Sequence, residues 1–89
     1  MRVELTKRFA KELDKLPRKI QLKVVEVLEN LDEADSLSDI EDFKALSGYN
    51  NFYRIKLGQY RIGLFLNGET FLVERIGVRG DFYKSYPPR

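Results

Sequence analysis

The residues of this chain that could carry out chemistry are cations and tyrosines, and their densest group lies between positions 53 and 62. This segment, YRIKLGQYRI, contains Arg54, Lys56 and Arg61. Arg54 and Lys56 are two residues apart, so on a strand they point to one face while the alternate apolar residues can enter a core. Three cations on a rigid hairpin would make a fixed positive surface, suited to a polyanion such as the RNA backbone. Solvated strand faces also carry Lys and Arg, and the strand pattern alone does not separate these two interpretations.

A second group of polar residues follows near the C-terminus and could join the hairpin. Arg79 and Tyr83 come directly after the last apolar strand pattern. Tyr83 and Tyr86 are expected to be exposed because they follow the sheet. Arg75, next to Glu74 in a strand, is at least as well suited to a structural ion pair as to ligand binding.

The composition excludes several classes of active site. The chain has no Cys and no His, which removes thiol chemistry, the usual zinc ligands and the commonest general base near neutral pH. Acid–base chemistry would have to come from Lys, Arg, Tyr or carboxylates. No phosphate-binding glycine loop or metal-ligand pattern is present, so we expect neither a cofactor nor a metal.

The lack of any long apolar run leads us to expect a cytoplasmic protein without a membrane partner.

The net charge of +2 conceals an uneven distribution. Residues 1–48 carry 9 Lys and Arg against 11 Asp and Glu, whereas residues 49–89 carry 7 against 3. Residues 24–43 contain acids but no Lys or Arg, and we expect there a solvated acidic surface. Cations on the two predicted helices could form a basic face, either simply solvated or docking on RNA: Lys7, Arg8, Lys11, Lys15, Lys19 and Lys23.

The chain is long enough for one domain, residues 1–89, and hydrophobic periodicity indicates its elements. A short strand is expected at Val3–Leu5. Thr6 can cap a first helix that ends before Pro17, and a second helix is expected over Arg18–Asp32. Residues 33–51 are expected to form a loop, with a short helical turn using Ile40, Phe43 and Leu46.

Three further strands are predicted, with a helical turn after them. They are Phe52–Leu57, Tyr60–Leu66 and Thr70–Val78, followed by the turn at Asp81–Tyr86. Asn67-Gly68 indicates a type I′ hairpin. The expected fold is α+β, in the order β-α-α-β-β-β: a helical hairpin packed on one face of a small antiparallel sheet, with the other face partly open.

Taken in order, these segments resemble the RelE branch of the RelE/ParE toxin superfamily. The resemblance rests on FAKELDKLP at 9–17, KALSG at 44–48, YRIKLGQYRI at 53–62 and ERIGVRGDFYK at 74–84. It implies the toxin of a type II toxin–antitoxin pair, which enters the A site of the 70S ribosome and cuts mRNA there. It also implies a separate antitoxin as partner, with operator DNA bound only indirectly through that antitoxin.

The resemblance also implies roles for single residues. Arg54 would contact the RNA backbone, and Lys56 the attacking ribose. Arg61 would clamp a phosphate, Arg79 would lie near the scissile phosphate, and Tyr83 would stack on a base and take part in proton transfer. The chain departs from the pattern by having Val78 and Gly80 where relatives often carry cations.

Two other functions stay open on the sequence. A ParE-like toxin, which shares the fold, would poison DNA gyrase by protein–protein contact. A catalytically weak homologue would act mainly through antitoxin binding. The combination of Lys56, Arg61 and Arg79 with Tyr83 favours RNA cleavage over the ParE-like activity, and growth arrest on induction without antitoxin would argue against the weak homologue.

Overall fold

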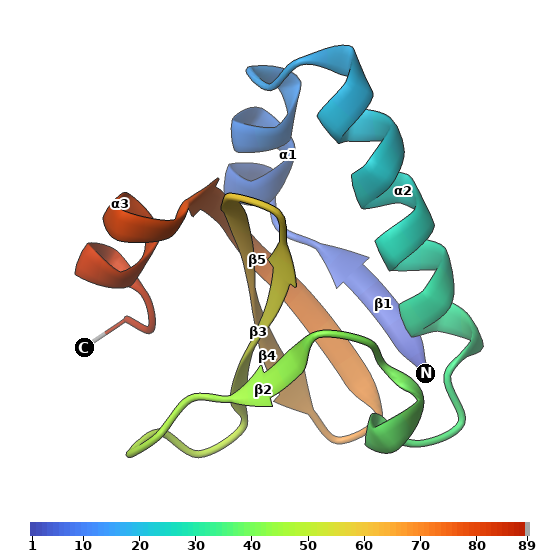
Figure 1. Cartoon of the computed structure of the whole chain (residues 1–89). Helices are drawn as coiled ribbons and strands as arrows, with labels where there is room; N and C mark the ends of the chain where they lie inside the picture. The colour runs from blue at the N-terminus through green and yellow to red at the C-terminus, as the bar shows by residue number, and fades with distance from the viewer. Residues whose placement is uncertain (89) are drawn as a thin grey trace.

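A five-stranded sheet carries two helices on one face and a short third helix on the other (Figure 1). The computed structural model describes residues 1–88. The elements in chain order are β1 (Arg2–Leu5), α1 (Lys7–Asp14), α2 (Arg18–Glu33), the 3-10 turn η1 (Leu37–Asp39), β2 (Phe43–Ala45), β3 (Phe52–Leu57), β4 (Tyr60–Asn67), β5 (Thr70–Val78) and α3 (Arg79–Ser85). The expected α+β class is confirmed.

The sheet is mixed rather than fully antiparallel. Its strand order is β1-β5-β4-β3-β2, and β1 runs parallel to β5 while the other neighbours are antiparallel. A parallel pair needs a long connection, and after β1 the chain runs through both helices and three strands before it returns as β5. Local periodicity contains no information about that long-range pairing.

The fifth strand, β2, was not predicted. The expected helical turn around Phe43 is wrong: the helical part is only the η1 turn, which Ser36 and Asp39 close with a capping box. Phe43 instead lies opposite Ile55 in the sheet, and its ring stacks on Tyr53 at 4.6 Å. Three residues are too few to show a strand period, so this pairing is decided by tertiary contacts.

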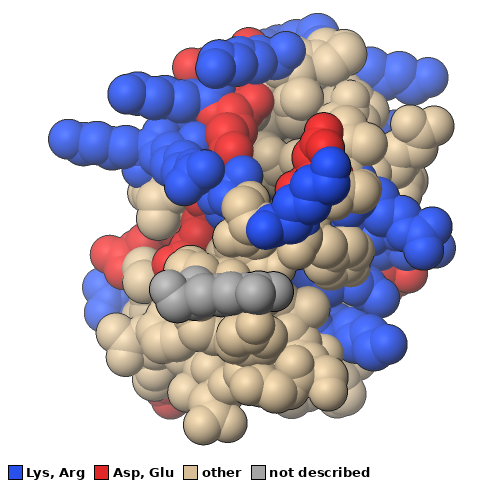
Figure 2. All heavy atoms as spheres, turned by 90° about the vertical axis from the view of Figure 1, so that its left-hand side faces the viewer, with Lys and Arg blue, Asp and Glu red and all other residues tan. Residues whose placement is uncertain are grey.

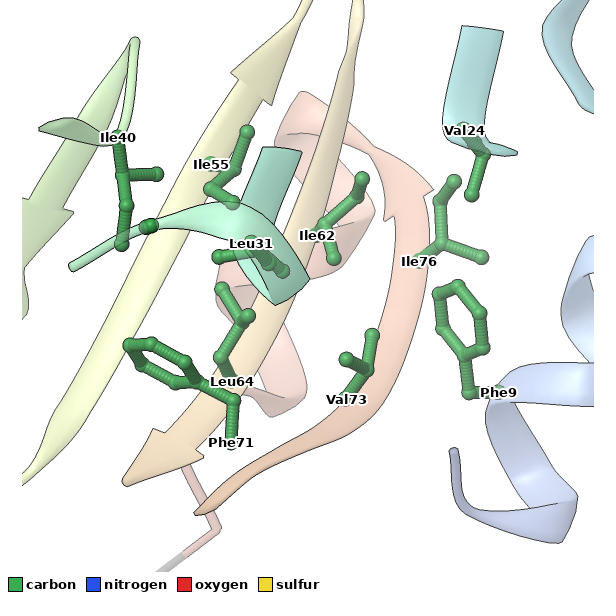
Figure 3. Packing of buried hydrophobic residues seen from close by; sticks show 11 residues of the cluster. Phe9, Val24, Leu31, Ile40, Ile55, Ile62, Leu64, Phe71, Val73 and Ile76 are labelled. Atoms are coloured by element: carbon green, nitrogen blue, oxygen red, sulfur yellow. The ribbon is translucent and has the colours of Figure 1, made fainter. Parts of the chain in front are cut away.

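The two helices bury one apolar face against the sheet. The Oγ1 of Thr6 accepts a hydrogen bond from the Phe9 N–H at 3.1 Å, which confirms the predicted cap of α1. Pro17 directly precedes α2. Phe9 and Val24 reach from the helices to Ile76 of β5, where all three side chains are buried (Figure 3). This packing fixes the sheet beneath the helices.

Two tight hairpins join the three long strands. Each two-residue loop has its positive φ at the first position, +59° at Gly58 and +63° at Gly68. A positive φ at that position alone is the type II′ pattern, so the type I′ turn expected at Asn67-Gly68 is wrong. Asn67 instead ends β4, opposite Thr70.

The second face of the sheet is covered more fully than expected, because α3 packs on it. Phe82 and Tyr86 are 1% and 3% exposed, and their rings approach each other at 5.1 Å. The Tyr86 ring also meets Phe52 of β3 at 5.8 Å. The predicted exposure of Tyr86 is therefore wrong, whereas Tyr83 is exposed as expected, at 42%.

Candidate functional site

The structure brings three of the predicted site residues to one end of the sheet. Lys56 of β3 and Arg61 of β4 are directly opposite cross-strand partners beside the Gly58-Gln59 turn. Directly opposite residues have Cβ atoms about 5 Å apart and share a face of the sheet. Arg79 begins α3, and its backbone N–H donates to the Gln59 carbonyl of the same turn at 2.9 Å. The β3–β4 turn therefore positions all three cations.

Arg61 is the buried cation of this group, with 6% of its surface exposed. Its Nη1 donates to the carbonyls of Gly58 and Tyr60, at 2.8 and 2.9 Å. Among residues 1–88 no carboxylate lies within ion-pair distance of its guanidinium. A guanidinium held by carbonyls and lacking an acid partner keeps its full positive charge for a bound anion.

Arg54 and a cation that the sequence analysis missed extend this face. Arg54 is half-buried and donates from Nη1 to the Asp42 carbonyl at 2.8 Å, so its position is set by the loop before β2. Lys44 of β2 lies directly opposite Arg54 and is exposed. Lys44 was overlooked because its segment was interpreted as a helical turn. The segment KALSG is too short to show the two-residue period of a strand, so the sequence did not indicate that Lys44 lies on one.

Tyr83 lies on α3 one turn after Arg79, at the i+4 position that shares a helix face. Its ring contacts the buried Phe82 ring edge-on at 5.1 Å, and 42% of its surface stays exposed. An exposed aromatic ring beside an arginine can stack on an unpaired base. Seen from the α3 side, Lys and Arg side chains project from much of the surface (Figure 2).

Arg75 is a structural residue. Its Nε lies 3.0 and 3.1 Å from the two carboxylate oxygens of Glu12 on α1, and its Nη1 donates to the Ser85 hydroxyl on α3 at 2.9 Å. Glu12 also accepts the Ile76 backbone N–H at 3.1 Å. Of the two alternatives for Arg75, the structure shows the ion pair. This network joins α1, β5 and α3.

A second polar contact attaches the end of α3 to the sheet. The Tyr86 hydroxyl donates to the Glu74 carboxylate at 2.7 Å. Burial, followed by this hydrogen bond and the negative charge of Glu74, raises the pKa of the Tyr86 phenol above its ordinary value, against a smaller opposite effect of Arg75. Tyr86 is thus a packed, protonated anchor.

The six cations predicted to form a basic face on the helices are all exposed: Lys7, Arg8, Lys11, Lys15, Lys19 and Lys23. That they share one face stays a prediction. Arg8 makes a long, exposed ion pair with Glu12 at 4.0 Å.

Residues 1–88 contain no cluster of three or more Asp or Glu side chains placed to bind a metal ion. Within the same residues, no helix has the length and apolarity needed to cross a membrane.

Comparison with known proteins identifies relatives over almost the entire chain. The family described as "ParE toxin of type II toxin-antitoxin system, parDE" matches residues 3–82. Toxin RelE3 of Methanocaldococcus jannaschii is 36% identical over 88 residues, which cover 98% of this chain and 100% of that protein.

Solved structures give the same result. The RelB-RelE antitoxin-toxin complex from Methanococcus jannaschii contains a chain that matches with a TM-score of 0.79 and 34% identity, over 93% of this chain and 98% of that one. A chain of the archaeal RelE-RelB complex from Pyrococcus horikoshii matches with a TM-score of 0.74 and 25% identity, over 89% and 94%. The chain therefore belongs to the RelE/ParE superfamily, as a RelE-like toxin of a type II toxin–antitoxin system.

Proposed function

We propose that this toxin is a metal-independent endoribonuclease that cuts mRNA in the ribosomal A site and thereby inhibits translation. The observation that carries the proposal is the convergence of Lys56, Arg61 and Arg79 around one turn, with Tyr83 one helical turn further on.

RNA cleavage suits a site without histidine, because RNA carries its own nucleophile. The ribose 2′-OH attacks the adjacent phosphorus in line, and the bond from phosphorus to the 5′-oxygen breaks. The enzyme must hold the strand in that geometry and stabilise the added negative charge. Arginine supplies both, as a planar and permanently charged fork for phosphate oxygens. The leaving 5′-oxygen takes up one proton, which balances the proton lost by the 2′-OH, so the products are a 2′,3′-cyclic phosphate and a 5′-hydroxyl.

The residues of the site divide the steps of this scheme among them. Lys56 or Tyr83 assists removal of the 2′-OH proton. Arg61 holds the phosphate through the guanidinium donors that its backbone contacts leave free, and Arg79 stabilises the transition state or the leaving oxygen. Arg54, with Lys44 opposite it, contacts the RNA backbone beyond the cleaved bond. Substitutions that remove single donors of this kind cost about 10²- to 10³-fold in rate in comparable sites.

The exposed cations on α1 and α2 dock the toxin on ribosomal RNA in this proposal. Contacts to phosphates fix the orientation of a protein on nucleic acid without reading sequence. The six cations lie outside the turn that carries the proposed catalytic residues, so they would affect ribosome binding rather than the chemical step.

In this proposal a cognate antitoxin suppresses the activity, and the RelB-RelE antitoxin-toxin complex from Methanococcus jannaschii supports such a partner. Operator DNA would be contacted only through the antitoxin.

A ParE-like activity against gyrase is the second candidate, because the matching family bears the ParE description. Two assays on the purified toxin separate the candidates. The first maps cleavage of mRNA on translating ribosomes, and the second measures supercoiling by gyrase. The proposal predicts A-site cleavage and unchanged supercoiling. Inhibited supercoiling with intact mRNA would refute it, and inertness in both assays would leave a toxin that acts only through antitoxin binding.

A further inference from the structure

An aromatic patch lies on the α3 face of the sheet, at the end away from the Gly58-Gln59 turn. Its members are Tyr49 of the β2–β3 loop, Phe52 of β3 and Phe65 of β4. Phe52 and Phe65 are cross-strand partners with ring centroids 4.8 Å apart, and the Tyr49 ring meets Phe52 edge-on at 6.3 Å. Tyr49 is 37% exposed, and the other two rings are half-buried. Three neighbouring aromatic rings in contact with solvent mark a surface for binding.

The patch continues the row of cations that starts at the proposed cleavage site. Phe52, Arg54 and Lys56 follow one another at every second position of β3, so they share a face. At about 3.3 Å per residue, the first and the last of these are about 13 Å apart along the strand. Lys44 lies opposite Arg54, between the two ends. One strip of surface therefore leads from the catalytic turn past two cations to the aromatic rings.

Backbone hydrogen bonds hold the loop that carries Tyr49. The Leu46 N–H donates to the Phe52 carbonyl at 2.9 Å, and the Tyr49 N–H donates to the Leu46 carbonyl at 3.2 Å. The other end of the loop is attached to β4, where the Leu66 N–H donates to the Asn51 carbonyl at 2.8 Å. Because the ring is already held in place, binding through it costs little conformational entropy.

The charges along the strip favour RNA as its occupant. Neither Lys44 nor Arg54 makes an ion pair within residues 1–88, so both keep their charge for an anion. The lower part of this face, where the β2–β3 loop lies in Figure 1, is mostly uncharged (Figure 2). A single-stranded RNA brings phosphates for the cations and unpaired bases for the rings. A second copy of this chain would bring the same two cations to the seam and be repelled.

We propose that Tyr49, supported by Phe52 and Phe65, is a platform on which a base of single-stranded RNA stacks, a few nucleotides away from the cleaved bond. Lys44 and Arg54 carry the intervening backbone. Every base has a flat aromatic face, so the platform holds the strand without selecting a sequence. The inference rests on the proposed function, because the strand that it holds is the RNA that the toxin cuts.

The inference can be tested with the whole toxin and two single-stranded probes. The first is hexaadenylate with 2′-O-methyl riboses, which lacks the nucleophile and is not cleaved. The second is a base-free hexamer of tetrahydrofuran units with the same number of phosphates. Binding of both is measured by fluorescence anisotropy at low salt. Leu22→Ala is the control, because it removes an exposed apolar side chain from α2, outside the strip.

Tyr49→Ala should weaken binding of hexaadenylate by at least about fivefold, the loss typical when a base-stacking ring is removed. Its binding of the base-free probe should change by less than about twofold, because only the stacking is lost. Tyr49→Phe keeps the ring and should bind hexaadenylate as the wild type does. Lys44→Ala should weaken binding of both probes, because it removes a phosphate contact. Leu22→Ala should alter neither.

Several results would overturn the inference. One is unchanged binding of hexaadenylate by Tyr49→Ala, and another is failure of the wild type to bind this probe. Equal weakening of both probes by Tyr49→Ala would also do so, because the ring would then act on the fold rather than on a base. A toxin dimer that Tyr49→Ala dissociates would make a second copy the occupant.

The outcome can be separated from that of the proposed catalysis. Cleavage of mRNA on ribosomes is measured in parallel on the same wild-type preparation. Intact cleavage, together with hexaadenylate binding that does not depend on Tyr49, refutes only the stacking platform. Binding that depends on Tyr49, in a toxin that does not cleave, refutes only the proposed endoribonuclease.

Discussion

The ring of Tyr86 lies directly on Gly63, so closely that a Cβ atom on Gly63 would come within 2.6 Å of the ring carbon Cε2. Gly63 lies in β4 between Arg54 on one neighbouring strand and Arg75 on the other. The missing side chain leaves the space in which the end of α3 docks. Because α3 carries Arg79 and Tyr83, this contact helps to position two residues of the proposed site.

Gly63→Ala should therefore destabilise the protein. The methyl group would have to displace a buried aromatic ring, and overpacking of this kind typically costs about 1–3 kcal/mol. Urea unfolding followed by circular dichroism measures the loss. Gly80→Ala is the matched control: a Cβ at Gly80 would meet nothing within 4 Å, and alanine favours the helix that contains it. Equal effects of the two substitutions would show that Tyr86 does not occupy this space.

The buried Tyr86 phenol predicts a loss of stability in alkali. Its pKa is raised above the ordinary value of 10.0 in the folded protein, so the unfolded chain loses this proton first. The stabilising contribution is therefore complete below about pH 10 and declines as the pH rises above it. Between about pH 9 and about pH 11 the free energy of unfolding should fall more steeply for the wild type than for Tyr86→Phe. Parallel slopes would contradict the raised pKa.

Glu12→Ala should cost about 1–3 kcal/mol, because it leaves both Arg75 and the Ile76 N–H without their acceptor. Arg75 is only 15% exposed at its side chain, so water cannot fully replace the lost carboxylate. Asp14→Ala, at an exposed acid on the same helix, is the control and should change the unfolding free energy by less than about 0.5 kcal/mol. A loss for Glu12→Ala no larger than for the control would show that the network contributes nothing.

Whether the sequence predicted a feature of the fold or of the site depended on how far apart in the chain the interacting residues lie. Predictions from residues close together in the chain were confirmed: Thr6 caps a helix, and Arg54 and Lys56 share a strand face. The parallel pairing of β1 with β5 was not predicted, because β5 begins 65 residues after β1 ends. The same limit hid Lys44 on an unrecognised strand and the burial of Tyr86, whose partner is a glycine distant in the chain.

The proposed docking face on α1 and α2 predicts a change in salt dependence. Lys11→Glu and Lys15→Glu should each weaken binding to ribosomes and reduce the slope of log K against log salt by about one. Arg2→Glu changes an exposed cation on β1, outside this face, and should leave the slope unchanged. Sedimentation of toxin with ribosomes at several salt concentrations provides the measurement. Identical slopes for all variants would show that the helix cations are only solvated.

The most direct test of the central claim is A-site cleavage of mRNA on translating ribosomes by Arg79→Ala, compared with the wild type and with Lys84→Ala, an exposed cation on the same helix. The account predicts that Arg79→Ala folds normally and cleaves about 10²- to 10³-fold more slowly, because the developing phosphate charge loses a donor, while Lys84→Ala stays close to the wild type. Cleavage by Arg79→Ala at the wild-type rate would contradict the proposed site.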